Sequence, residues 1–295
     1  MAAKGLVVCW GEILWDMFPD GIKLGGAPAN VAYHLAQVGA DVAMVSRVGR
    51  DSLGDNAIKA LDADGVDTVS VQRDPDRPTG VVVVDVVDGE PKYTLTEGAA
   101  WERIELDDGA KRVVSRAAAL CYGTLSQRSP EGRRQLERAL SAAGDDCVRV
   151  CDVNLRPNYV DDDLVAMSLS AADIVKINDK EQAILEQRFG KKNATAWLVH
   201  ELGAKLVAVT RGRGGCRLVT ANEDFEHAGF SARSGGDNVG AGDAFTAVLT
   251  WLHLCGAPLS AIGQAANRYA SFVASRRGAT PEIPRNIADH VRRHT

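Results

Sequence analysis

The chain has 295 residues, of which 45% are hydrophobic and 25% are charged, and its formal net charge is −5. This composition is that of an ordinary globular protein, and the mild negative charge argues against a nucleic-acid-binding surface. No run approaches the roughly 18 uninterrupted apolar residues that a membrane helix needs. We therefore expect neither a nucleic acid nor a membrane as a partner.

Short apolar runs alternate with longer amphipathic segments along the chain. Six runs are too short and too apolar for surface helices and predict strands: Leu6–Trp10, Val42–Val48, Ala117–Tyr122, Val148–Val153, Ile174–Ile177 and Leu206–Thr210. Five other segments have helical patterns: Pro28–Val38, Leu53–Asp64, Pro130–Ala143, Ala244–Leu254 and Leu259–Ser275. Strands that alternate with helices predict an α/β fold, in which a mainly parallel sheet is covered on both faces.

The first apolar run ends at Gly11, and the acidic residues Glu12 and Asp16 follow at once. No small-residue cleavage site is present, so a buried strand is favoured over a signal peptide. The six cysteines form no C-x-x-C pair, and three of them lie inside apolar runs. There Cys acts as a small buried hydrophobe. Free thiols and a cytoplasmic location are the expectation.

One region departs from the alternation of strands and helices. Gly80–Val87 and Lys92–Thr96 are strand-like runs joined by Asp-Gly-Glu-Pro, a sequence typical of a hairpin. A hairpin without a helix is expected to leave the main sheet, and Glu12–Phe18 could pair with it. Such an excursion is either a lid over a site or a plain edge hairpin.

No linker or internal repeat divides the chain. We therefore expect a single domain over residues 1–295, with lid segments at about 12–24 and 79–100. The exposed edge of such a lid could pair with the same edge of a second copy, which would give a homodimer.

A glycine pair precedes the first predicted helix. Gly25 and Gly26 would let the backbone approach a ligand closely, and Pro28 suits the first turn of a helix. Asn30 lies in that turn, where its amide can both donate and accept hydrogen bonds with a polyol. A plain turn at a helix start explains the same residues, and the two interpretations stay open here.

A second run of small residues, Gly240, Ala241 and Gly242, precedes Asp243 at the start of another predicted helix. Small residues let successive backbone N–H groups converge into an anion site. Asp243 could simply cap the helix, but a cap does not require the small residues before it. A carboxylate beside an anion site suits phosphoryl transfer, in which a positioned base accepts the proton of the attacking hydroxyl.

Polar residues also follow three further strands. Asn178 and Glu181 could order a hydrated Mg²⁺, or they could form a capping box. Thr210 and Gly212 begin a glycine-rich loop that suits a nucleotide.

The third of these strands is followed by Asp152, Asn154 and Arg156. Buried strands seldom end in three large polar groups unless these groups serve a ligand. An ion pair between Asp152 and Arg156 is the structural alternative.

These elements, in this order and spacing, resemble the ribokinase-like carbohydrate kinases, the PfkB family, over nearly the whole chain. Gly25–Ala32 resembles the substrate motif of that family in the form found among fructokinases, and Asp237–Asp243 resembles its C-terminal signature. The resemblance implies a three-layer αβα sandwich with a mainly parallel central sheet and a small β lid. It implies a kinase that uses ATP and Mg²⁺.

The resemblance also implies roles for individual residues. Asp243 would be the general base, and Gly240, Ala241 and Gly242 would form the anion hole. The residues implied to bind the sugar are Asp16, Gly25, Gly26, Asn30 and Arg156. Those implied to bind the nucleotide and its Mg²⁺ are Asn178, Glu181, Thr210, Gly212 and Asn267, with Glu181 holding the metal through water.

One departure from the family pattern concerns a monovalent cation. Relatives have Thr after the first Asp of the signature, whereas this chain has Asn238 after Asp237. The resemblance places a cation such as K⁺ near Asp237, and the substitution leaves K⁺ dependence open.

The expected activity is transfer of the γ-phosphoryl of ATP to a sugar hydroxyl, with fructose as the first acceptor to consider. A 2-keto-3-deoxygluconate kinase is the alternative within the family, and Arg103, Arg128 or Arg156 could then pair with the carboxylate of the acceptor. A non-catalytic sugar or nucleotide sensor is a more distant alternative.

Overall fold

The computed structural model describes residues 5–18, 21–87, 90–156, 159–230 and 236–295. In these ranges nine strands form a large sheet, in the order β13-β12-β11-β10-β9-β8-β1-β4-β5. The strands from β11 to β5 are parallel to their neighbours, whereas β12 and β13 are antiparallel. The bounds are β1 Leu6–Trp10, β4 Val42–Gly49, β5 Val71–Asp74, β8 Ala117–Gly123, β9 Val148–Asp152, β10 Ile174–Asn178, β11 Leu206–Thr210, β12 Cys216–Val219 and β13 Asp224–His227.

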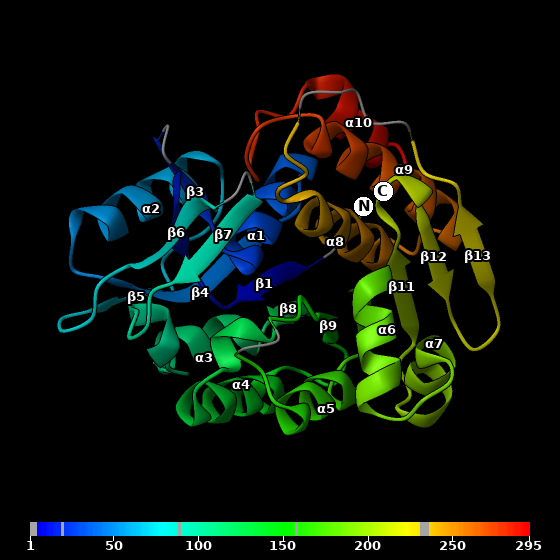
Figure 1. Cartoon of the computed structure of the whole chain (residues 1–295), viewed down its shortest axis with the longest axis horizontal. Coiled ribbons are helices and arrows are strands. Elements are labelled where there is room, and N and C mark those ends of the chain that lie inside the picture. Colours follow the sequence, from blue (N-terminus) through cyan, green and yellow to red (C-terminus); the bar gives the residue numbers. More distant parts are fainter. Residues whose placement is uncertain (1–4, 19–20, 88–89, 157–158, 231–235) are drawn as a thin grey trace.

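Helices cover both faces of this sheet (Figure 1), so the predicted three-layer sandwich is confirmed. One face carries α1, α8 and α9, and the other carries α3, α4 and α5. No helix in the described ranges has both the length and the hydropathy needed to cross a bilayer. The bounds are α1 Ala27–Val38, α2 Ser52–Ala63, α3 Asp108–Val114, α4 Pro130–Ala142, α5 Asp162–Ser170, α6 Asp179–Arg188, α7 Ala194–Ala196, α8 Ala241–Leu254, α9 Leu259–Ala274 and α10 Arg285–Arg292.

The central strands are mainly apolar because both of their faces are buried. In β1, Val7 and Cys9 belong to the core beneath α1 and α8, whereas Val8 and Trp10 belong to the core on the opposite face. This alternation follows from the two-residue period of a strand. Each fully buried side chain of this size contributes about 1.5–3 kcal/mol, so the central strands anchor the fold.

A second, four-stranded sheet has the order β3-β2-β6-β7. Leu14–Met17 of β2 pair in parallel with Gly80–Val83 of β6, as predicted for the excursion from the main sheet. The turn residues 88–89 lie outside the described residues. The bounds are β2 Leu14–Phe18, β3 Gly21–Gly25, β6 Gly80–Val87 and β7 Glu90–Leu95.

The strand order changes direction beside β1. After β1 the chain adds β4 and then β5 on one side, and it returns to add β8 on the other. In open α/β sheets, ligands bind outside the carboxyl ends of the strands at such a switch point. The segments that follow β1, β8, β9 and β10 therefore converge on one place.

His34 is a fully buried polar residue that connects α1 to the C-terminal part of the chain. Its Nδ1 lies 3.2 Å from the hydroxyl of Tyr269 on α9, and its Nε2 lies 2.9 Å from the carbonyl oxygen of Ala279. Burial lowers the pKa of His34 to about 3. The neutral ring satisfies both contacts, because Nε2–H donates to the carbonyl and Nδ1 accepts from the hydroxyl.

We expect this histidine to make stability depend on pH. Its pKa is about 6.5 in the unfolded chain, so the unfolded state gains a proton below pH 6.5 that the folded state refuses. Stability is fully present above that pH and falls by about 2 kcal/mol between pH 6.5 and 5. Urea unfolding of the wild type and of His34→Gln at both pH values measures this loss. An equal loss in both proteins would contradict the prediction.

Candidate active site

Two cavities meet where the carboxyl ends of the strands converge. The first, which we call the Asp243 cavity, has a volume of about 560 Å³ and is lined by Asp16, Asn30 and Arg156, among others. The second, the Asn267 cavity, has a volume of about 410 Å³. Both cavities are lined by Lys176, Asn178 and Gly242. These three residues therefore stand at the junction of the cavities.

The start of α8 lies at this junction. Gly240 has a φ of 74°, and a Cβ there would lie 2.5 Å from the Cα of Ala279, so a glycine is required. The helix begins at Ala241, three residues before the predicted start at Ala244. Gly242 and Asp243 consequently lie in its first turn, where backbone N–H groups have no partner within the helix. The positive end of α8 points at the junction.

Asp243 does not cap α8, so the structural alternative considered for it is wrong. No side chain caps this helix, and Asn30 Nδ2 instead donates to Asp243 Oδ2 at 2.7 Å. Burial, together with the nearby Asp152, raises the pKa of Asp243 to about 6, although Asn30, Lys176 and Arg156 oppose the rise. At pH 7 the group is largely ionised and is a stronger base than an ordinary carboxylate.

A buried ion pair lies beneath the first turn of α8. Lys176 Nζ donates to Asp152 Oδ1 at 3.0 Å, and the hydroxyl of Thr246 donates to Asp152 Oδ2 at 2.6 Å. Asp152 therefore pairs with Lys176, and the alternative of an ion pair with Arg156 is wrong. A Cβ on Gly242 would lie 2.9 Å from Lys176 Nζ, which places the ammonium group directly beside the backbone of the predicted anion hole.

No sequence motif assigns a role to Lys176, although a lysine within an otherwise apolar strand indicates a buried charge. It is the charged member of the apolar strand β10 and is 6% exposed. Burial lowers the pKa of Lys176, but the carboxylates of Asp152, Glu181 and Asp243 outweigh this effect and raise it above the ordinary value. The residue is therefore a permanent cation between the two cavities.

Gly25 and Gly26 let the start of α1 approach two carboxylate-bearing residues. A Cβ on Gly25 would lie 2.5 Å from Asp16 Oδ2, and a Cβ on Gly26 would lie 2.3 Å from the backbone oxygen of Glu12. The sequence predicts that the backbone at these two glycines approaches a ligand closely. In the structure it lies against Asp16 and Glu12. Burial raises the pKa of Asp16 to about 6, while Arg156 lowers it.

Asn178 and Glu181 form the capping box of α6. Glu181 Oε2 accepts from the N–H of Asn178 and its Oε1 accepts from the N–H of Leu155, both at 2.8 Å. Glu181 also lines the Asp243 cavity, so the cap does not exclude a second role. Because both oxygens already hold an N–H group, the residue fits an Mg²⁺ that is held through water and keeps most of its own water ligands.

The predicted nucleotide-binding residues come together in the Asn267 cavity. Thr210 ends β11, Gly212 lies in the next turn, and Asn267 projects from α9, and all three line the cavity. Asn267 Nδ2 donates to the carbonyl of Gly263 at 2.7 Å, which fixes the amide. Small residues of α9, Ala270 and Ala274, complete an apolar wall.

Two residues of the C-terminal signature show how its backbone is held. Asp237 is exposed, and its carboxylate accepts from the N–H groups of Val239 at 3.0 Å and Gly278 at 2.8 Å. Asn238 has a φ of 60°. Asn tolerates this left-handed conformation, which is costly for a β-branched residue. The left-handed backbone at position 238 therefore explains why this chain has Asn where the family signature has Thr.

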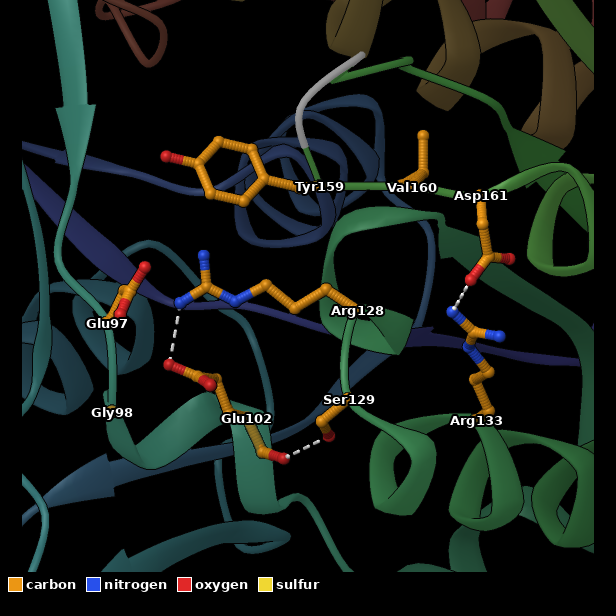
Figure 2. Close-up of a pocket in the computed structure, with 9 residues that line it drawn as sticks. All are labelled: Glu97, Gly98, Glu102, Arg128, Ser129, Arg133, Tyr159, Val160 and Asp161. Carbon is orange, nitrogen blue, oxygen red and sulfur yellow. Dashed lines mark hydrogen bonds and ion pairs between the residues drawn. The ribbon is translucent and has the colours of Figure 1, made fainter.

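A third cavity of about 590 Å³ surrounds Arg128 and adjoins the Asp243 cavity, because Tyr159 lines both (Figure 2). Arg128 donates to Glu102 Oε1 at 2.6 Å. Its guanidinium also lies over the rings of Trp101, at 4.6 Å, and Tyr159, at 5.2 Å. Arg128 is therefore already paired within the protein, and so is Arg133, which also lines this cavity and pairs with Asp161.

Replacing Gly26 tests the close approach of α1. Gly26 has a φ of 103°, so Gly26→Ala combines backbone strain with the clash against Glu12. Gly256→Ala is the matched control, because Gly256 has a φ of 72° and no atom within 4 Å of an added Cβ. Strain alone costs about 1–2 kcal/mol, and the clash adds about 1–3 kcal/mol. Equal losses in urea unfolding would show that no clash exists.

Known proteins are similar to this chain over most of its length. The family model for pfkB family carbohydrate kinases matches residues 21–286. An uncharacterized sugar kinase of Pyrococcus horikoshii, PH1459, is 28% identical over 294 residues, which cover 93% of this chain and 92% of that protein. Fructokinase-2 of Zea mays is 31% identical over 270 residues, which cover 83% of this chain and 79% of that protein.

Solved structures share the fold. The structure of PH1459 in complex with ATP has a TM-score of 0.84 and 25% identity, covering 97% of this chain and 99% of that chain. Fructokinase with bound ATP from Xylella fastidiosa has a TM-score of 0.86 and 24% identity, covering 99% of both chains. Since the family model spans nearly the whole α/β sandwich with its small second sheet, the chain belongs to the PfkB family of carbohydrate kinases.

Proposed function

We propose that the chain is an ATP-dependent kinase that phosphorylates a hydroxyl of a neutral sugar, with fructose as the acceptor. The observation that supports this most directly is the position of Asp243. Its carboxylate is hydrogen-bonded to Asn30 in the Asp243 cavity, next to Gly242, where the Asn267 cavity begins. A sugar in the first cavity and a nucleotide in the second would meet at the first turn of α8.

In the proposed reaction the sugar hydroxyl attacks the γ-phosphorus of ATP. A new bond forms between the sugar oxygen and phosphorus, the bond to the β–γ bridging oxygen breaks, and ADP leaves. Asp243 accepts the proton of the hydroxyl as the new bond forms. The backbone N–H groups of Gly240, Ala241 and Gly242, with Lys176 beside them, stabilise the charge on the transferred group.

ATP would occupy the Asn267 cavity. The complexes of PH1459 and of the Xylella fructokinase with ATP support this nucleotide. In this chain, Thr210, Gly212 and Asn267 would contact the nucleotide, with the small residues of α9 against its base. Mg²⁺, when bound, neutralises phosphate oxygens, and Glu181 would hold it through water. A monovalent cation at Asp237 would share that carboxylate with two backbone N–H groups.

The charges of the Asp243 cavity favour a neutral acceptor over a sugar acid. Among the residues that the structure describes, four acidic residues line this cavity, whereas only two basic residues do. The acids are Glu12, Asp16, Glu181 and Asp243, and the basic residues are Lys176 and Arg156. Lys176 already pairs with Asp152. A further carboxylate on the acceptor would be repelled, which disfavours 2-keto-3-deoxygluconate.

The other two arginines that could pair with the carboxylate of a sugar acid do not line the Asp243 cavity. Arg128 is bound to Glu102 (Figure 2), and Arg103 lines a separate cavity with Glu105 and Asp107. The name of the Zea mays relative, a fructokinase, supports fructose within the neutral class. A non-catalytic sensor is disfavoured, because both the base and the glycines of the anion hole are present.

We also infer that the small sheet serves as a lid. Leu14 and Asp16 of β2, Val82 of β6 and Leu95 of β7 line the Asp243 cavity. Apolar side chains in this position would exclude water from the transferred phosphoryl group, which suppresses its transfer to water.

An assay over a panel of acceptors tests the proposed function. ADP release would be measured with Mg²⁺ and ATP against fructose, ribose, 2-keto-3-deoxygluconate and nucleosides, with and without K⁺. We expect turnover with a neutral sugar and the highest kcat/KM with fructose. Preference for the sugar acid would contradict the charge argument, and no turnover with any polyol would overturn the proposed function.

The base is tested by Asp243→Asn. We expect kcat to fall at least about 10²-fold, while the Kd for the sugar, measured by calorimetry, changes little. Because the pKa of Asp243 is about 6, kcat of the wild type should decline as pH falls through about 6. Asp289→Asn on α10 is a control for the loss of an exposed acid. Near-normal turnover in Asp243→Asn would remove this residue as the base.

A further inference from the structure

Glu12 is a buried acid to which the sequence motifs assign no role. It follows β1 at the switch point of the sheet, is 3% exposed and lines the Asp243 cavity. The backbone N–H groups of Glu12 itself and of Ala27 lie near enough to its carboxylate to lower the pKa of Glu12. Its Oε2, however, is buried and has no hydrogen-bond partner among the described residues.

A buried carboxylate oxygen without a donor is costly, because the group has lost water and gained nothing in exchange. Asn30 carries a second acceptor of this kind, since its Oδ1 is also buried and has no partner in the described part of the chain. Both residues line the same cavity. The cavity thus presents two unsatisfied acceptors, which is the complement of a ligand rich in hydroxyl donors.

The surrounding charges leave Glu12 able to act as an acceptor at neutral pH. Burial raises its pKa to about 7, Arg156 lowers it, and Asp243 raises it. Arg156 follows β9, Asp243 lies on α8, Asp16 lies on β2 and Lys176 lies on β10, and all four line the cavity that Glu12 faces. A hydroxyl donated to Oε2 would stabilise the ionised form.

We propose that Glu12 is a specificity-determining residue that binds the acceptor sugar, its Oε2 accepting a hydrogen bond from a hydroxyl other than the one that is phosphorylated. The proposal rests on the proposed function, in which Asp243 takes the reacting hydroxyl. A site built to bind a hydroxyl discriminates strongly against an analogue that lacks it, because its buried acceptor is then left unpaired. Glu12 would therefore help to select polyols.

The competing explanation is structural: Glu12 would serve only to hold the N–H of Ala27 at the start of α1. Glu12→Gln separates the two. The amide keeps one carbonyl oxygen for Ala27 and the same shape, but it replaces the other oxygen with an NH₂ group that cannot accept. A structural role would leave sugar binding intact, whereas a binding role would not.

The experiment is steady-state kinetics with D-fructose, Mg²⁺ and ATP. In Glu12→Gln we expect the KM for fructose to rise about 10- to 100-fold, which is the range for a hydrogen bond to a charged group, while kcat and the KM for ATP change less than about 3-fold. Asp51→Asn is the control, because Asp51 accepts from Gly54 and Thr79 away from the cavity. It should lower the Tm without changing the KM for fructose.

Monodeoxy analogues of fructose identify the contact. One analogue should have a raised KM with the wild type and should lose no further affinity with Glu12→Gln, because the two changes remove the same hydrogen bond. In the wild type, the KM for fructose should rise as pH falls through about 7, since a protonated carboxyl group is a donor and a much weaker acceptor than the carboxylate. This rise should vanish in Glu12→Gln down to about pH 6, where Asp16 and Asp243 take up protons.

The outcomes separate this proposal from the proposed function. A wild type that turns over fructose, together with an unchanged KM in Glu12→Gln, overturns the role of Glu12 alone. Additive effects of Glu12→Gln and every monodeoxy change overturn it as well. A wild type that phosphorylates no sugar of the panel overturns both proposals.

Discussion

The buried ion pair between Lys176 and Asp152 supports the rest of the site. Lys176 lies where the two cavities meet, beside Gly242 and among the carboxylates of Glu181 and Asp243. Removing one partner of such a pair leaves an uncompensated buried charge, which costs about 3–5 kcal/mol. The ammonium group of Lys176 compensates the acids that burial would otherwise neutralise, so it favours the ionised form of Asp243, the proposed base.

The acids are buried because the sheet brings the carboxyl ends of β1, β8, β9 and β10 to one place. Close contacts hold two of them there, because Gly25 and Gly26 fit the backbone against Asp16 and Glu12. Such arrangements lower stability and are retained where they preorganise a site. The raised pKa values of Glu12, Asp16 and Asp243 result from this burial.

The sequence predicts the central strands well, because both faces of each strand are buried and the runs are mainly apolar. The half-exposed strand β3 has no such run and is not predicted. Most of the residues that the motifs single out line the two cavities, although Gly25 and Asp237 line neither. The motifs do not predict how these residues pair. Asn30 and Asp243 lie 213 residues apart, and Asp152 pairs with a lysine from another strand. Burial of Glu12 and Lys176 depends on what packs over them, which local patterns do not encode.

The two cavities divide the chain in sequence as well as in space. Apart from the shared β10, Glu181 of α6 and the segment around the start of α8, residues up to Tyr159 line the Asp243 cavity and residues from Thr210 onward line the Asn267 cavity. Under the proposed function, substitutions in the first half would alter the acceptor while the nucleotide half is left as it is. In evolutionary terms such a fold would be modular. New acceptors would arise by changing one half of the gene, as expected where function resides in sites carried by a common scaffold.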